Sequence, residues 1–184
     1  MRVSDRPRLE TASLVLRAFA PSDAPRIFAL SQEDGMRKWL SNQVYRDEAH
    51  AASVLAFLAA QYRADIDLEA SPYVLGIELK TTGELVGHVG LSPLRGEVEI
   101  GFAVAQAHQR KGIATAAVRA LCEWAAEKAP TTRILGIAAR QNSASQRVLV
   151  RAGFQRQAET EMLFQGIEQP VMVFAYAPQR QSDQ

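Results

Sequence analysis

A short basic segment that contains a glycine offers the clearest chemistry in this sequence. It reads Gln109-Arg110-Lys111-Gly112-Ile113-Ala114 and precedes a long run with helical periodicity. The first amides of a helix have no partner within the helix and carry partial positive charge, so they can hold an anion. Gly112 and Ala114 let a bulky ligand approach the backbone, and Arg110 and Lys111 add charge. The segment suits a phosphate or pyrophosphate, although an ordinary helix start with solvated basic residues would look the same.

Other phosphate-binding and nucleophile motifs are missing from the sequence. No GxxxxGK[ST] loop occurs, and no GxGxxG follows a predicted strand. The chain also has no Ser-His-Asp or Cys-His signature of nucleophilic catalysis. Its single cysteine, Cys122, lies within an apolar helical stretch, so we expect a buried structural thiol and no internal disulfide.

A strand and a helix flank the basic segment. Alternation predicts a strand over Val98–Ala105, with Glu99 on the face opposite the apolar residues. After Gly112, apolar residues repeat at helical spacing as far as Trp124, and Pro130 stops the helix. The segment therefore joins the end of a strand to the beginning of a helix.

Short strands and helices alternate along the rest of the chain. A helix is predicted to start at Pro21-Ser22-Asp23, with Ser22 as its N-cap, and to end near Gly35. Asp47 and Asn142 are predicted to cap two more helices. A connector over 36–45 contains a short helical piece, residues 64–71 read as a loop, and turns are predicted at 81–83 and 93–96. The predicted strands are Ser13–Phe19, Tyr73–Leu79, Leu85–Leu91, Arg133–Ala138, and a closing hairpin of Gln155–Phe164 and Val171–Ala177.

These elements predict one α/β domain over residues 1–184. Because a helix separates the strands at 98–105 and 133–138, we expect these two strands to be parallel. The pattern predicts a mixed, mostly antiparallel central sheet with helices on both faces. The core should run from about residue 9 to 177, with short polar tails at both ends.

Composition limits the classes of partner. Apolar residues make up 47% of the chain, charged residues make up 22%, and the net charge is +1. This near-neutral balance favours neither nucleic acid nor an anionic membrane as a partner. No N-terminal apolar run resembles a signal peptide, no apolar stretch approaches membrane-spanning length, and the single cysteine fits a reducing compartment. We therefore expect a cytoplasmic protein.

Three parts of the sequence resemble the GNAT superfamily of N-acetyltransferases. Gln109 to Ala114, after a strand reading EIGFAV, is similar to the Q-x-x-G-x-A motif that binds acetyl-CoA in that family. Asn142-Ser143-Ala144-Ser145 and then Arg151-Ala152-Gly153-Phe154 are similar to its N-x-x-S…AGF segment. The opening of the chain resembles the RimJ/RimL-type branch, which acetylates the N-termini of ribosomal proteins. That opening comprises Leu9-Glu10-Thr11, Leu14-Val15-Leu16-Arg17 and Pro21-Ser22-Asp23-Ala24.

The resemblance implies an enzyme that uses acetyl-CoA and transfers the acetyl group by direct attack of a primary amine. It implies no metal and no covalent enzyme intermediate. It further implies that the strands at 98–105 and 133–138 splay apart and that the pantetheine arm pairs with backbone between them. The residues implied for acetyl-CoA binding are Phe102, Ala103, Val104, Gln109, Arg110, Lys111, Gly112, Ile113, Ala114, Thr115, Asn142 and Ser145.

Two residues are candidates for the general base. Glu99 matches the glutamate of the family's E-I-G-[FY] strand and could take a proton from an ammonium substrate, directly or through water. A hairpin folded about Leu94 and Arg95 would place His88 opposite Gly101, diagonal to Glu99 on the same face. His88 would then be the base, tune Glu99, or be a satisfied structural histidine.

Ser145 is the candidate for the acid, because it matches the serine of N-x-x-S and could hydrogen-bond the CoA sulfur. Many GNAT enzymes place a tyrosine near this helix for the acid role, but no tyrosine occurs between Tyr73 and Tyr176 here. The resemblance therefore leaves the acid role to Ser145 or to water. Ser145 could equally serve only to stabilise the helix start, which Asn142 caps.

The acceptor is predicted least sharply. Trp39, Tyr45, His88, Phe164 and Glu168 are candidates to contact it. The branch resemblance favours a protein N-terminal α-amine. The alternatives are a small amine, such as a polyamine, an amino acid or an aminoglycoside, and a non-catalytic acyl-CoA-binding module. A homodimer is compatible with the sequence, but no residue requires it.

Overall fold

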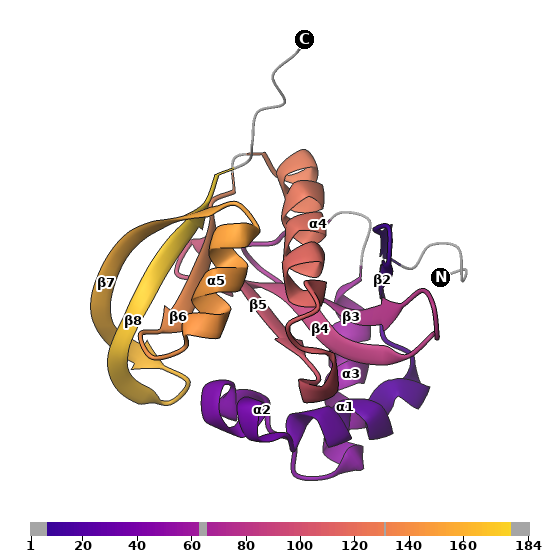
Figure 1. The fold of residues 1–184 in the computed structure, drawn as a ribbon. Coiled ribbons are helices and arrows are strands. Elements are labelled where there is room, and N and C mark those ends of the chain that lie inside the picture. Colours follow the sequence, from indigo (N-terminus) through magenta and orange to yellow (C-terminus); the bar gives the residue numbers. More distant parts are fainter. Residues whose placement is uncertain (1–6, 63–65, 131, 178–184) are drawn as a thin grey trace.

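An eight-stranded sheet runs through the computed structural model, which describes residues 7–62, 66–130 and 132–177 (Figure 1). The strand order across the sheet is β1-β2-β3-β4-β5-β6-β8-β7. Every neighbouring pair is antiparallel except β5 and β6, which run parallel as predicted. The strands are β1 (Arg8–Glu10), β2 (Leu14–Arg17), β3 (Tyr73–Leu79), β4 (Leu85–Leu94), β5 (Glu97–Val104), β6 (Ile134–Ala139), β7 (Phe154–Phe164) and β8 (Ile167–Tyr176). The first of these, β1, was not predicted from the sequence.

Helices cover both faces of the sheet, which confirms the predicted α/β architecture (Figure 1). On one face, α4 (Ile113–Lys128) and α5 (Ser143–Arg151) lie side by side, joined by a hydrogen bond from Arg119 Nη2 to the Arg151 carbonyl (2.6 Å). On the other face lie α1 (Ala24–Ser31), α2 (Asp34–Trp39) and α3 (Glu48–Gln61). Three 3-10 turns complete the order: η2 (Pro21–Asp23), η3 (Ser41–Gln43) and η4 (Gln106–His108). No helix in the described parts of the chain has the length and apolar character needed to cross a membrane.

Alternation along β5 sets the core as predicted. Val98 and Ile100 are buried in the larger apolar cluster together with Ala117 and Leu121 of α4. A second apolar cluster lies on the opposite face, between α1, α3 and the sheet. The side chain of Glu99 lies on this second face, because successive strand residues point to opposite sides.

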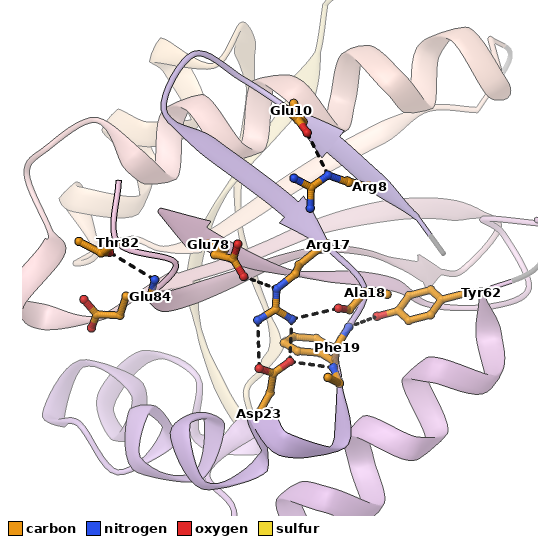
Figure 2. Close-up of polar contacts among 11 residues, drawn as sticks. Arg8, Glu10, Arg17, Ala18, Phe19, Asp23, Tyr62, Glu78, Thr82 and Glu84 are labelled. Carbon is orange, nitrogen blue, oxygen red and sulfur yellow. Dashed lines mark hydrogen bonds and ion pairs between the residues drawn. The ribbon is translucent and has the colours of Figure 1, made fainter. Parts of the chain in front are cut away.

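The beginning of α1 differs from the prediction (Figure 2). Ser22 does not cap this helix. A 3-10 turn precedes it, and Asp23 Oδ2 accepts a hydrogen bond from the Ala20 backbone N–H (2.7 Å). The Asp23 carboxylate also accepts hydrogen bonds from both terminal nitrogens of Arg17, at 2.7 and 3.0 Å. Arg17 Nε donates to Glu78 Oε2 at 2.5 Å. Asp23 is held by this buried ion pair, so it can organise the turn that an exposed serine cannot.

The end of α1 was also predicted wrongly. The helix ends at Ser31, and Gly35 lies inside the separate helix α2. The backbone of Glu33 between them is extended, which ends one helix before the other begins. A helix of six residues leaves too short a pattern to be separated from its neighbour by periodicity.

The β4–β5 hairpin turns one residue later than predicted, which shifts each cross-strand partner by two residues. Arg95 and Gly96 form the turn with positive φ angles of 49° and 82°, a geometry that favours glycine at the second position. Pro93 lies within β4, opposite Val98, beyond the last residue that β3 pairs. Its missing N–H therefore costs no ladder bond. This register places His88 opposite Ala103, not opposite Gly101, so His88 is not diagonal to Glu99.

Both remaining helix caps are as predicted. Asp47 Oδ1 accepts the His50 N–H (2.7 Å) at the start of α3, and Asn142 Oδ1 accepts the Ser145 N–H (3.1 Å) at the start of α5. Gly153 follows α5 with a φ of 102°. The predicted tails up to residue 6 and from residue 178, and residues 64 and 65 of the predicted loop, lie outside the described residues.

Candidate active site

The site forms where β5 and β6 separate. These strands pair only over Val98–Ile100 and Ile134–Gly136. The Val98 N–H bonds the Arg133 carbonyl on the β6 side (3.1 Å), so the peptide groups of Phe102 and Val104 also point toward β6. Beyond Ile100 no strand of the described residues pairs with that edge of β5. The predicted splay is therefore present, with backbone groups available to an extended ligand.

A cleft of about 440 Å³ opens at this gap. Its lining residues come from every element around the gap: α2, β5, β6, η4, the starts of α4 and α5, and the tip of the closing hairpin. Among the predicted acetyl-CoA contacts, the following line it: Phe102, Ala103, Val104, Gln109, Arg110, Gly112, Ile113, Ala114, Thr115, Asn142 and Ser145. Lys111 is not among the lining residues; it is exposed, and its ammonium donates to the Ala107 carbonyl at 3.0 Å.

The cleft reaches both faces of the sheet. Phe102 and Val104 share the face on which Val98 packs beneath α4, whereas Ala103 lies on the face of α2. All three residues line the cleft. The cleft therefore passes through the gap between β5 and β6, with one mouth beside α4 and α5 and the other beside α2.

The mouth beside α4 is suited to anions. Gly112 is the N-cap residue in left-handed conformation (φ 78°), with no side chain to satisfy the amides of the first turn. Three arginines line the cleft: Arg110, Arg147 and Arg151. Within the described residues none of them forms an ion pair, so their charge is available to a ligand. A phosphorylated ligand such as CoA fits this donor set.

Two polar side chains at α5 meet the cleft near the gap. Asn142 caps the helix: its Oδ1 accepts a hydrogen bond from the Ser145 backbone N–H. Both residues line the cleft. The Ser145 hydroxyl has no protein partner in the described residues. It can therefore donate to a ligand atom in the cleft while the cap remains intact.

Glu99 is an isolated, half-buried carboxyl on the face of α2. Burial raises its pKa from 4.5 to about 7, and no cation among the described residues offsets this. Glu99 does not itself line the cleft. It is separated from the lining residue Ala103 by Gly101, where an added Cβ would meet nothing within 4 Å. A carboxyl with a pKa near neutrality, beside open space, is suited to accept a proton at physiological pH.

His88 lies on the same face as Glu99 but farther along the strands. The pair Gly90 and Gly101 separates them in the ladder. His88 and Tyr45 line a small cavity of about 20 Å³, large enough for one water molecule, and neither lines the main cleft. The His88 Nε2 is buried without a partner in the described residues, and burial lowers the His88 pKa to about 4, so the ring is neutral at pH 7.

The mouth beside α2 contains two of the predicted acceptor contacts, Trp39 and Phe164. Glu168 lies on β8 opposite Leu163 and does not line the cleft. Sequence reasoning missed Glu33, Met36 and Leu40, which line the same mouth. The only signal for them was their position next to Trp39, because α2 is too short to show helical periodicity.

Comparison with known proteins shows which family has this architecture. Residues 13–155 match the family described as Acetyltransferase (GNAT) domain. The chain is 29% identical over 154 residues to the uncharacterised N-acetyltransferase YoaA of Bacillus subtilis (strain 168), covering 82% of this chain and 84% of YoaA.

Two solved structures share the fold. RimL, a ribosomal L7/L12 alpha-N-protein acetyltransferase in complex with coenzyme A, has a TM-score of 0.77 at 17% identity, covering 92% of this chain and 97% of RimL. The microcin C7 self-immunity acetyltransferase MccE, in complex with acetyl-CoA and AMP, has a TM-score of 0.76 at 15% identity, covering 91% and 94%. The family match spans most of the sequence, including the strands, gap and helix start that form the cleft. This protein therefore belongs to the GNAT family of acetyltransferases.

Proposed function

We propose that this enzyme transfers the acetyl group of acetyl-CoA to a primary amine, and that the favoured acceptor is a protein N-terminal α-amine. The observation that carries the proposal is the cleft through the sheet. One mouth has a helix start and three unpaired arginines, and the other lies on the face of an isolated carboxyl with a pKa near 7. This arrangement suits an anionic donor and an amine that must lose a proton.

The donor would bind along the gap and the start of α4. The free peptide groups of Phe102 and Val104 would pair with the amides of the pantetheine arm, as a further strand would. The amides of residues 113–115 and the Arg110 guanidinium would hold the pyrophosphate. The Val104 carbonyl already accepts the Gln109 side-chain amide at 3.0 Å, which leaves its N–H as the partner for the ligand.

Bound acetyl-CoA supplies a thioester carbonyl carbon, to which the amine nitrogen bonds as the C–S bond breaks. Glu99 would take the proton that the ammonium loses, through water in the space over Gly101. Ser145, or a water held by it, would give a proton to the departing sulfur and take in return the second proton that the nitrogen loses as the amide forms. Holding amine and thioester together can supply on the order of several kcal/mol of the reduction in the barrier.

The acceptor assignment draws support from the fold shared with RimL, described as an alpha-N-protein acetyltransferase, and from the opening segment of the sequence. We also expect a cytoplasmic location, because the buried thiol of the single cysteine needs no oxidising compartment.

An acetylation assay tests this function. Purified protein is mixed with acetyl-CoA and two groups of amines: peptides with free N-termini, and polyamines, amino acids and aminoglycosides. Products are identified by mass spectrometry. Acetylation of peptide N-termini supports the proposal, and acetylation of small amines alone refutes the acceptor assignment. Binding of acetyl-CoA with no product from either group would favour a binding module.

A further inference from the structure

The mouth of the cleft beside α2 is apolar. Met36 is buried, while Trp39 and Leu40 are half-buried on the same helix and its C-cap. Phe164, at the end of β7, faces them across the cleft. These four side chains form what we term the acceptor wall: Met36, Trp39, Leu40 and Phe164. Such a surface favours apolar groups, because it offers no partner to a charge removed from water.

The charges in the cleft oppose a polycationic acceptor. Glu33 is the only carboxylate among the described residues that line the cleft, and Glu33 Oε2 already accepts the Gln106 backbone N–H at 2.7 Å. Three arginines line the same cleft. Further ammonium groups on the acceptor would therefore meet an apolar wall with a single carboxylate, Glu33, to pair with them.

Hydrogen bonds fix the acceptor wall at both ends. The Glu33 bond to Gln106 ties the start of α2 to η4, which follows β5. Beyond the C-terminal end of α2, Ser41 Oγ donates to the Gln165 carbonyl (2.9 Å), and the Asn42 N–H donates to Gln165 Oε1 (3.3 Å). The helix is thereby connected to the tip of the β7–β8 hairpin. The wall is formed before an acceptor arrives, so its chemistry can select the acceptor.

We propose, resting on the function proposed above, that the acceptor is an amine with one positive charge and an apolar group beside it, such as a peptide that begins with a large apolar residue. The apolar group contacts the acceptor wall while the amine reaches the thioester near the gap. Polyamines and aminoglycosides fit poorly, because the single carboxylate that lines this mouth, Glu33, cannot pair with several ammonium groups.

The first test compares acceptors on the wild-type enzyme at saturating acetyl-CoA. Peptides share one sequence after the first residue, which is Leu, Met, Ala, Ser, Glu or Lys; spermidine and kanamycin complete the set. We expect kcat/KM for the Leu and Met peptides to exceed that of the Glu and Lys peptides by about tenfold or more, with no product from the polycations. Equal rates, or a preference for the Lys peptide or the polycations, would overturn the inference.

The second test uses two neighbouring residues of β7 that point to opposite faces. Phe164 lines the cleft, whereas Leu163 is 62% exposed and does not. Phe164→Ala should raise KM for the Leu peptide by about tenfold, with the Kd for CoA unchanged by calorimetry. The matched variant Leu163→Ala should change neither constant. If the two variants had the same KM for the Leu peptide, the proposed contact between the peptide and the acceptor wall would be refuted.

A charge added to the wall provides the converse test. Leu40→Glu places a free carboxylate at this mouth, so the ratio of kcat/KM for the Lys peptide to that for the Leu peptide should rise several-fold. An unchanged ratio, with CoA binding retained, would overturn the inference. Acetylation of amines without an apolar preference refutes only this inference, whereas CoA binding without acetylation of any amine refutes the proposed function as well.

Discussion

At the scale of single residues, Glu99 is the group on which the proposed chemistry depends. Its pKa is about 7 because burial disfavours the carboxylate and no cation among the described residues offsets the effect. A free glutamate would be ionised throughout the range in which enzymes are usually assayed. Glu99 instead changes charge within that range, so its role can be read from pH dependence.

We expect the kcat of the wild-type enzyme, measured with both substrates saturating so that titration of the free acceptor amine does not contribute, to rise with pH through a midpoint near 7, as Glu99 becomes able to accept a proton. Glu99→Gln should lower kcat by about 10²- to 10⁴-fold and remove this midpoint. Initial rates between pH 5.5 and 9 measure both effects. His88→Gln is the comparison variant, because a ring with a pKa of about 4 contributes no midpoint near 7. A midpoint that survives in Glu99→Gln would rule out Glu99 as the base.

The same substitution should increase stability. The folded state raises the Glu99 pKa above 4.5, the ordinary value, so the folded protein binds more protons than the unfolded chain between pH 4.5 and 7. Glu99 therefore lowers the free energy of unfolding as pH rises through that window. At pH 8 Glu99→Gln should be more stable than wild type by on the order of 2 kcal/mol, and at pH 4.5 by little. Urea denaturation at the two pH values tests this difference.

At the scale of elements, two glycines on neighbouring strands have opposite surroundings. An added Cβ at Gly136 of β6 would lie 2.5 Å from Leu149 Cδ2 of α5, and Leu149 is only 1% exposed. An added Cβ at Gly101 of β5 would meet nothing within 4 Å. Gly136 thus permits close approach of α5 to the sheet, and Gly101 leaves room beside Glu99.

We expect Gly136→Ala to lower the free energy of unfolding by about 1–3 kcal/mol, because the buried leucine must shift. Gly101→Ala should leave stability nearly unchanged but lower kcat/KM, because the methyl group narrows the space between Glu99 and the cleft. Chemical denaturation and initial-rate assays on both variants separate the two effects. Equal loss of stability in both variants would contradict this assignment.

The elements show what a sequence can and cannot predict. The α4 helix, the β5 alternation and the Asn142 cap were predicted correctly, because each rests on a local pattern. The β4–β5 register was wrong by two residues, because the turn depends on paired left-handed residues and on a proline that loses no bond. Half of the acceptor wall was missed: Trp39 and Phe164 were predicted, but Met36 and Leu40 were not, since these residues meet only through the packing of α2 against the closing hairpin.

At the scale of the whole molecule, net charge conceals the charge of the site. The chain carries a net charge of only +1, yet three arginines that form no ion pair within the described residues converge on one mouth of the cleft. Their convergence depends on α4 and α5 lying side by side (Figure 1). The sequence predicted that Arg110 lies near the ligand, but it could not establish that Arg147 and Arg151 of α5 line the same cleft.

We expect Arg147→Ala and Arg151→Ala each to weaken CoA binding by about three- to tenfold, more at low ionic strength than at high, because a cation that faces phosphate is lost. The control is Arg140→Ala, which removes an arginine that pairs with Glu159 outside the cleft. Calorimetric titration of CoA at two salt concentrations measures the effect. Equal affinities for all three variants would show that these arginines do not contact the donor.

The passage of the cleft through the sheet also bears on whether both substrates are bound at the same time during turnover. If donor and acceptor approach from opposite faces, as proposed, neither must leave before the other enters, and the chain needs no group that stores the acetyl unit between them. Initial rates measured at several concentrations of both substrates should therefore give double-reciprocal lines that intersect, the pattern of a ternary complex. Parallel lines would require an acetylated enzyme, and the only cysteine of the chain, Cys122, is buried away from the cleft.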